Sequence, residues 1–346
     1  MGKIRYGVLA IALCVLGLLS AVTTSEEPAG DEKSDLFQVR KEREYGFVSR
    51  DGTVVIEPQF EAAFDFSEGL AAVAKKGKWG YIDATGKAVV PLGYARAYPF
   101  TEGLAAVTLE RAWGYVDRNG AMVLPYTYVH AMPFEAGFAV VKVRGGDALI
   151  DRQGNRLRDR VYREASGFFD GLACVGIGAV TVQYGFVDRT GRMVIEPVLD
   201  KPGTFSEGLA CVTKEGKHLF IDKTGKTAFT LECEEAYPFH GGLAAVKKGG
   251  KWGFVDVKGA FVIQPQYDTA MPFSEGLAAV SLAGKHGFID ATGKVVVPLE
   301  FEGASSFRKR LALVQSQGKS GYINHEGQFA VKPVYDPFVP PAKADK

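Results

Sequence analysis

The chain has 346 residues, of which 47% are hydrophobic and 23% charged, a composition typical of a folded protein rather than a long disordered one. Its formal net charge of +1 offers no electrostatic basis for binding nucleic acid or an anionic membrane surface. The 42 glycines recur at regular intervals, which predicts many tight turns.

The N-terminal residues have the features of a secretory signal. Lys3 and Arg5 precede an apolar run at residues 6–19, and small and polar residues follow it. The run is shorter than the roughly 20 residues that a membrane-spanning helix needs. We therefore expect a signal peptide at residues 1–24 that is removed, a polar linker at residues 25–35, and a protein that is secreted, periplasmic or held at the cell surface. A membrane anchor formed by an uncleaved signal is the alternative.

After the linker, the sequence repeats with a period of about 34 residues. A turn glycine marks nine units, and one interval is longer because about three residues are inserted at 176–183. These glycines are Gly52, Gly86, Gly120, Gly154, Gly191, Gly225, Gly259, Gly293 and Gly327. The phrase FSEGLAAV, or a close variant, begins at Phe66, Phe100, Phe205 and Phe273. We expect nine units over residues 36–341, followed by a tail at 342–346.

Each unit is expected to contain three short strands rather than two helices. Paired-helix repeats share this period, but Gly and Pro interrupt every unit too often for a stable helix. In the second unit the expected strands are residues 70–75, 79–83 and 88–91, which are rich in aromatic and β-branched residues. Such an antiparallel meander cannot bury its apolar face alone, so neighbouring units should stack.

The turn after the second strand has the pattern D-x-T/N-G-K/R. An Asp at its first position can accept a backbone N–H, and the Gly three residues later can adopt the positive φ of a type I turn with a bulge. The column contains Asp83, Asp117, Asp151, Asp188, Asp222, Asp256 and Asp290, with Ser49 and Asn324 in the outermost units. We expect these two substitutes to make the same hydrogen bond. The turn explains the whole column, so none of these aspartates is a predicted catalytic residue.

An aromatic-Gly pair begins the second strand of most units. The pairs are Tyr45-Gly46, Trp79-Gly80, Trp113-Gly114, Tyr184-Gly185 and Trp252-Gly253, whereas two units have Asp147-Ala148 and His218-Leu219 instead. Together with the turn motif and the EGLAAV phrase, the pairs resemble the tryptophan-glycine (WG) β-repeat family over nearly the whole array. The resemblance implies an all-β repeat architecture in bacterial, often exported proteins that mostly have no assigned biochemical activity.

Two architectures fit nine such units. A propeller blade usually has four strands and about 40 or more residues, whereas only three strands are evident in each unit here. The outermost units also resemble caps: charged residues replace the LAAV phrase in the first, and the last ends in PFVPP at 337–341. We therefore favour an open, curved β-solenoid, with a β-propeller as the alternative.

No pattern in the sequence indicates a catalytic, metal or cofactor site. The five histidines form no pair with another His or Cys at metal-ligand spacing, and no glycine-rich turn precedes a helix as a phosphate-binding loop requires. We predict a non-catalytic module that binds a protein or glycan through its repeat surface. The alternatives are an enzyme with a site at the 176–183 insertion or in a central cleft, and a structural protein of the cell envelope.

One column varies in chemistry while the framework around it is constant. Besides Ala62, Thr269 and Gly303, it contains Arg96, His130, Glu164, Lys201 and Glu235. Repeat scaffolds build extended binding surfaces from such variable side chains. The five charged or ring-bearing members are therefore the predicted partner-binding residues.

Three cysteines follow the signal: Cys174, Cys211 and Cys233. An oxidising compartment would allow one disulfide. Cys174 and Cys211 occupy equivalent positions in adjacent units, where four other units have Ala. A disulfide between these two residues and a pair of free, buried thiols both fit the sequence.

Overall fold

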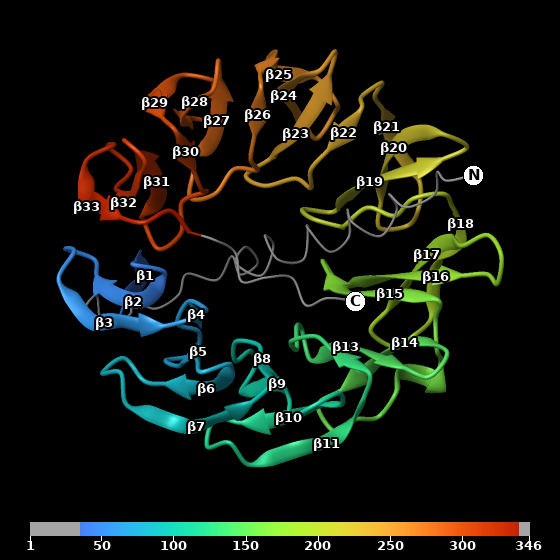
Figure 1. The fold of residues 1–346 in the computed structure, drawn as a ribbon. Helices are drawn as coiled ribbons and strands as arrows, with labels where there is room; N and C mark the ends of the chain where they lie inside the picture. Colours follow the sequence, from blue (N-terminus) through green and yellow to red (C-terminus); the bar gives the residue numbers. More distant parts are fainter. Residues whose placement is uncertain (1–34, 339–346) are drawn as a thin grey trace, which may run out of the picture.

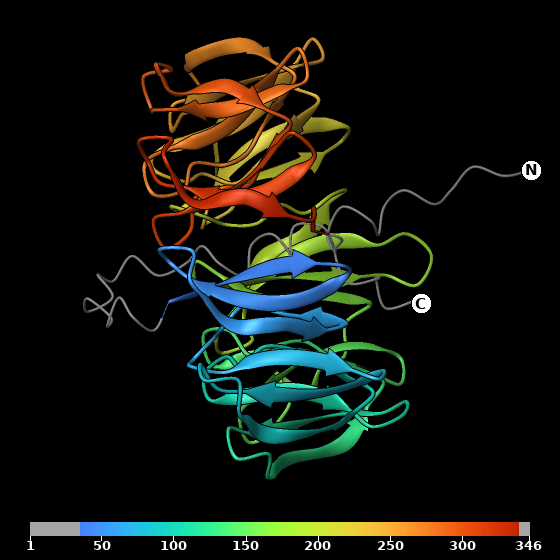
Figure 2. The same ribbon diagram turned by 60° about the vertical axis from the view of Figure 1, so that its left-hand side comes forward.

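The computed structural model of the protein describes residues 35–338. Nine antiparallel sheets follow one another in these residues and are arranged around a ring, which makes the molecule a nine-bladed β-propeller (Figure 1). From the side, the sheets of successive blades lie one on the next (Figure 2). The predicted all-β repeat class is confirmed, but the favoured open solenoid is wrong and the propeller alternative is right. The predicted signal peptide, the linker up to residue 34 and the tail at 342–346 lie outside the described residues.

Six of the nine sheets have four strands and three have three. The three-stranded sheets are blade 1 with β1 (Leu36–Lys41), β2 (Glu44–Ser49) and β3 (Val54–Phe60), blade 4 with β12 (His130–Ala131), β13 (Phe138–Val143) and β14 (Gly146–Asp151), and blade 6 with β19 (Leu209–Lys214), β20 (Lys217–Asp222) and β21 (Thr227–Thr230). The first three four-stranded sheets are blade 2 with β4 (Ala62–Ala63), β5 (Ala71–Lys75), β6 (Lys78–Ile82) and β7 (Ala88–Tyr94), blade 3 with β8 (Arg96–Ala97), β9 (Leu104–Thr108), β10 (Trp113–Asp117) and β11 (Met122–Tyr128), and blade 5 with β15 (Glu164–Phe169), β16 (Leu172–Ile177), β17 (Gln183–Asp188) and β18 (Met193–Leu199). The others are blade 7 with β22 (Glu235–Ala236), β23 (Leu243–Lys248), β24 (Lys251–Asp256) and β25 (Phe261–Tyr267), blade 8 with β26 (Thr269–Ala270), β27 (Ala278–Leu282), β28 (Lys285–Ile289) and β29 (Val295–Phe301), and blade 9 with β30 (Gly303–Ala304), β31 (Ala312–Ser316), β32 (Lys319–Ile323) and β33 (Phe329–Tyr335).

The strand that the sequence did not predict is the innermost one. In blade 2, β4 pairs with β5 at Ala62↔Ala74 and Ala63↔Val73, and it lies nearer the centre of the ring than β7 (Figure 1). Two residues are too few to show the alternation by which a strand is recognised in a sequence. In six of the nine units a fourth strand of this kind turns the predicted meander into a four-stranded propeller blade.

The end of the described chain completes the first blade. The Asp336 N–H donates to the Arg40 carbonyl at 2.7 Å, and the Asp336 carboxylate accepts the Glu42 N–H at 2.8 Å. Glu302 makes the same two kinds of bond to the hairpin of blade 9 that follows it. Residues 336–338 therefore stand where blade 1 lacks an inner strand of its own.

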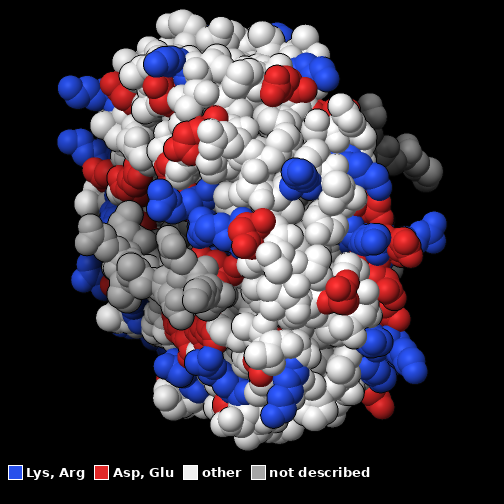
Figure 3. All heavy atoms as spheres, turned by 90° about the vertical axis from the view of Figure 1, so that its left-hand side faces the viewer, with Lys and Arg blue, Asp and Glu red and all other residues white. Residues whose placement is uncertain are grey.

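Apolar packing closes the same junction. The ring of Phe37 in blade 1 lies 5.3 Å from the ring of Tyr322 in blade 9, and the Tyr322 hydroxyl donates to the Gln38 carbonyl at 2.7 Å. The ring of Phe338 lies 6.0 Å from that of Tyr45. On the side of the ring that carries blades 1 and 9, acidic and basic side chains are interspersed (Figure 3). The interpretation of the outermost units as caps was therefore wrong, because they contact each other.

The D-x-T/N-G-K/R turns have the predicted mechanism. Asp83 Oδ1 accepts the backbone N–H groups two and four residues ahead at 2.9 and 3.1 Å, and Gly86 has a φ of 84°. Asn324 makes the same two bonds at 3.2 and 2.9 Å. The expectation for Ser49 was wrong: its hydroxyl donates instead, and Asp51 accepts a backbone N–H.

The glycine of each aromatic-Gly pair lies against the backbone of the neighbouring outer strand. A Cβ on Gly253 would lie 2.5 Å from the carbonyl oxygen of Ile263 in β25, closer than real contacts of this kind. The two units without this glycine are units without a full outer strand. Blade 4 has Ala148 and ends at β14, and blade 6 has Leu219 and a four-residue β21. One steric cause therefore links the departures in sequence to the missing or shortened outer strands of these two blades.

Side chains of the F-S/T-E-G phrase join successive blades. The Ser67 hydroxyl donates to the Phe100 carbonyl at 2.7 Å, and the Glu68 carboxylate accepts the Gly103 N–H at 3.0 Å. Blade 4 has Glu135 at the position of this serine. Its longer, ionisable side chain makes that junction sensitive to pH.

Burial, and then the nearby Glu102 carboxylate, raises the pKa of Glu135 from 4.5 to about 7. Because the folded-state pKa is the higher one, stability falls as the pH rises from about 4.5 to 7 and stays at the lower level above that. We expect Glu135→Gln to raise the free energy of unfolding by about 2 kcal/mol at pH 8, after allowance for partial exposure, and by much less at pH 5. Urea denaturation at the two pH values checks this, and an equal effect at both would contradict it.

Candidate functional site

The predicted partner-binding residues lie along the inner edge of the ring. Arg96, His130, Glu164 and Glu235 are the first residues of β8, β12, β15 and β22, and Lys201 forms an isolated bridge at the equivalent point of blade 6. In Figure 1, β8 and β22 lie nearer the ring centre than β11 and β25. The variable column of the sequence therefore follows the inner edge of five consecutive blades.

His130 is enclosed by aromatic neighbours. Its Nε2 lies 3.4 Å from the Tyr98 hydroxyl oxygen, and its ring centroid lies 5.0 Å from that of Trp113. Burial, and then the charges of Lys142 and Arg96, lower the pKa of His130, so the imidazole is neutral at pH 7. A neutral, packed imidazole supports the aromatic cluster and does not attract an anion.

The acidic members of the column are paired, whereas the basic ones are not. Glu164 accepts a hydrogen bond from a tyrosine hydroxyl at 2.8 Å, and Glu235 accepts one from a lysine ammonium at 3.0 Å. Arg96 and Lys201 are exposed, and neither forms an ion pair with another residue in the described part of the chain. Each of these five blades therefore contributes one such side chain to the inner edge of the ring.

Departures from the repeat concentrate between blades 4 and 5. An irregular segment that contains the 3-10 helix η2 (Leu157–Asp159) replaces the outer strand of blade 4, and it is attached to β14 by the isolated bridges Ile150↔Arg156 and Asp147↔Tyr162. In blade 5, the inserted residues lengthen the loop between β16 and β17 to residues 178–182. The insertion therefore forms a hairpin loop at one face of the ring.

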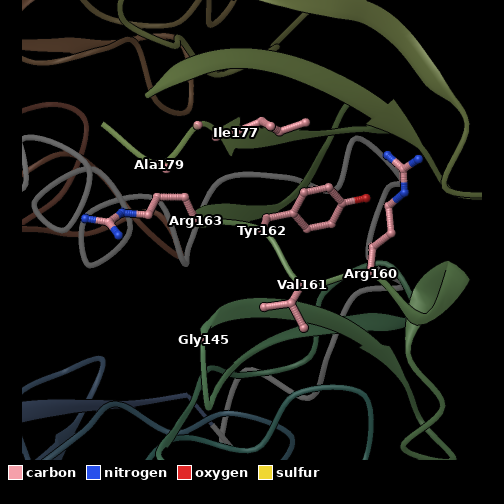
Figure 4. A pocket seen from close by; sticks show the side chains of 9 residues that line it. Gly145, Arg160, Val161, Tyr162, Arg163, Ile177 and Ala179 are labelled. Atoms are coloured by element: carbon pink, nitrogen blue, oxygen red, sulfur yellow. The ribbon is translucent and has the colours of Figure 1, made fainter. Parts of the chain in front are cut away.

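A pocket of 510 Å³, which we call the blade 4–5 groove, lies between these two irregular segments (Figure 4). Residues 160–163 line one side and residues 176–179 the other. Gly178 has a φ of 127°, and a Cβ there would lie 2.0 Å from the Thr181 carbonyl oxygen, so the longer loop requires glycine at this point. The sequence indicated the insertion but not the segment opposite it, which carries no motif.

Apolar side chains lie in the middle of the groove and arginines at its ends. Val161 is 40% exposed and Ile177 is 38% exposed. Figure 4 shows both side chains between Arg160 and Arg163, whose guanidinium groups lie on opposite sides of the view. Both arginines are exposed, and neither forms an ion pair within residues 35–338. Val180, in the inserted loop, is 97% exposed.

The described residues hold no cluster of three or more His, Cys, Asp or Glu side chains placed to bind a metal ion. Over the same part of the chain, no helix has the length and apolar character needed to cross a membrane. The turn aspartates accept hydrogen bonds from their own turns, as Asp83 does, so their carboxylates are already engaged.

The three described cysteines are free, and Cys174 lies in a different core from Cys211 and Cys233. Cys174 is buried between blades 5 and 6 together with Ala210 and Val212. Cys211 lies between those two residues on β19, so its side chain points to the opposite face of the sheet, toward blade 7. A disulfide between Cys174 and Cys211 does not fit this fold, because the sheet of blade 6 separates the two side chains.

Nine blades that close into a ring, with an irregular junction between blades 4 and 5, define a β-propeller repeat protein. A family model described as "WG containing repeat" matches residues 45–79, 79–110, 113–146, 184–217, 220–252, 252–285, 287–319 and 321–336, which is more than half of the chain. The chain therefore belongs to the WG-containing repeat family. The matches leave out residues 147–183, which form most of the blade 4–5 groove.

Comparison with solved structures gives one similar fold at low sequence identity. One, described as "Crystal structure of the eukaryotic initiation factor", is 13% identical with a TM-score of 0.61, and the alignment covers 86% of this chain and 95% of that chain. Another, "Dihydro-heme d1 dehydrogenase NirN in complex with DHE", is 12% identical with a TM-score of 0.47 and covers 92% and 78%. No curated protein matches the sequence significantly. The first similarity supports the propeller fold alone, and the second is too low to support an argument.

Proposed function

We propose that this protein is a non-catalytic interaction module that acts outside the cytoplasm and binds a peptide segment of a partner protein in the blade 4–5 groove. The observation that carries the proposal is an exposed apolar strip between two arginines that lack ion-pair partners, at the junction where the array departs from its repeat. The signal-like sequence at residues 1–24 supports the location.

Exposed apolar side chains on a loop support a protein ligand. Val161, Ile177 and Val180 would lose contact with water on binding, as side chains at the centre of a protein interface do. A glycan site would instead use exposed aromatic faces. Trp113 and Trp252 are buried, Trp79 is half-buried, and none of the three lines the groove. We therefore favour a protein over a glycan partner.

The arginines support a ligand with acidic residues on both sides of an apolar one. A guanidinium group binds a carboxylate through two parallel hydrogen bonds, more specifically than an ammonium does. Because the guanidinium groups of Arg160 and Arg163 lie at opposite ends of the groove, one acidic side chain cannot pair with both. An extended segment with an apolar residue between flanking Asp or Glu residues matches the apolar strip and both arginines.

The experiment is a library of extended peptides in which Leu, Ile or Val lies between Asp or Glu residues, with binding to the folded protein measured by fluorescence anisotropy. We expect the combined change Arg160→Glu and Arg163→Glu, and separately Ile177→Asp, to weaken binding of the best peptide at least about tenfold. Added salt should weaken wild-type binding, because exposed charge pairs are screened.

Matched controls lie in other blades. Leu282→Asp changes an exposed apolar residue in the equivalent hairpin of blade 8, and Lys258→Glu with Lys285→Glu reverses two exposed charges. These variants should bind as the wild type does. Equal loss in groove and control variants, or failure of every peptide in the library to bind, would overturn the proposal.

A further inference from the structure

Blade 6 lacks the last part of its outer strand. In blade 7, β25 continues to Tyr267, which pairs with Trp252 across the sheet. The equivalent residues of blade 6 are Cys233 and His218, but β21 ends at Thr230 and the two do not pair in the ladder. A half-buried cysteine therefore replaces the large aromatic residue that anchors the end of the outer strand in blade 7.

A second thiol lies against this one. The thiols of Cys211 and Cys233 are close enough to share a hydrogen bond, and both side chains pack against the apolar core between blades 6 and 7. The Cys211 Sγ atom also lies 4.0 Å from Nδ1 of His218. Both cysteines are partly accessible, whereas Cys174 is buried in a different core.

The electrostatic setting assigns different roles to the two thiols. The hydrogen bond from Cys211, and then the Lys248 ammonium, lower the pKa of Cys233 despite its partial burial. The same hydrogen bond, and then burial, raise the pKa of Cys211. Burial raises the pKa of Cys174 as well. Cys233 is thus the thiol that ionises first, Cys211 is its protonated neighbour, and Cys174 is unreactive.

We propose that Cys211 and Cys233 form a disulfide by exchange with an oxidised thiol–disulfide donor, and that this bond fastens the shortened outer segment of blade 6 to β19. The Cys233 thiolate attacks the donor disulfide and displaces one donor thiolate, which leaves a mixed disulfide on Cys233. Cys211 then loses its proton to His218 or to water, attacks the Cys233 sulfur and releases the second donor thiolate. Two electrons pass from the cysteine pair to the donor, whose disulfide becomes two thiols. This inference does not depend on the proposed partner binding.

The test uses the folded, full-length protein with glutathione disulfide as the donor. Thiols that are still free are then alkylated under native conditions, and the protein is digested without reduction and mapped by mass spectrometry. We expect one linked peptide pair that contains Cys211 and Cys233, with Cys174 alkylated only after unfolding. A link that involves Cys174, or a glutathione adduct on Cys233 that never resolves, would overturn the proposal, as would no oxidation at all.

Cysteine variants distinguish disulfide formation between Cys211 and Cys233 from non-specific oxidation of any thiol. Cys174→Ala should form the same link at the same rate, whereas Cys211→Ser should stop at the glutathione adduct on Cys233. Circular dichroism of each variant confirms that it is folded before oxidation. If Cys211→Ser fails to fold, the peptide map of the wild type alone still decides the outcome.

Discussion

The change Gly253→Ala is expected to lower the free energy of unfolding by about 3 kcal/mol, although it adds one methyl group. The added Cβ would lie 2.5 Å from the Ile263 carbonyl oxygen and close to the backbone of the next two residues. Backbone atoms of a paired strand cannot move aside as a flexible side chain can. The outer strand must therefore shift away from β24 and lose part of its ladder.

Ala148→Gly is the matched control, because it changes the same repeat position in the reverse direction. Blade 4 has no regular outer strand beside β14, so Ala148 meets no such carbonyl. We expect this variant to lose only about 1.5 kcal/mol, from the conformational entropy cost of glycine in a strand and the loss of one buried methyl group. Both variants are measured by urea denaturation. A loss for Gly253→Ala as small as that for Ala148→Gly would refute the steric explanation of the WG motif.

A chain that ends at Tyr335 is expected to lose about 4 kcal/mol of stability compared with the full chain. The truncation removes the two hydrogen bonds of Asp336 to blade 1, the bond from Arg40 to the Pro337 carbonyl at 2.8 Å, and the packing of Phe338 on Tyr45. Blade 1 then has an uncovered inner edge, and the contact between the first and last blades is weakened.

A chain that ends at Phe338 is the control for this truncation, because it keeps every described contact of the junction. We expect its thermal unfolding midpoint to equal that of the full chain, while the shorter chain unfolds several degrees lower. In an open array these terminal residues would lie at a free end and contribute little to the stability of the fold. Equal midpoints for the two truncated chains would therefore contradict closure through residues 336–338.

Local chemistry was sufficient to predict the middle strands and the turns. The expected strand at 79–83 is β6 (Lys78–Ile82), and the turn glycines have the expected positive φ. The third strand was predicted to end at Pro91, but β7 continues to Tyr94. Proline is tolerated there because β7 is the outermost strand, where an N–H can be missing on the side that faces solvent.

Ring closure could not be predicted because its signal is not local. The inner strand has only two residues in most four-stranded blades, and in blade 1 it is replaced by residues from the other end of the chain. The variable column was found because a surface that differs from unit to unit is visible against a constant framework. The groove was not predicted because only one of its sides, the insertion, is visible as an interruption of the repeat. Which side chains line the groove depends on burial and side-chain direction, which the sequence does not show.

Closure by the last part of the array also determines the order in which the protein can be completed during synthesis. Arg40 and Pro337 are 297 residues apart, so a nascent chain carries the first blade long before its inner edge can be covered. Until then that edge exposes unpaired backbone groups, which other strands can join. The blade that emerges first from the ribosome is thus the last to be finished.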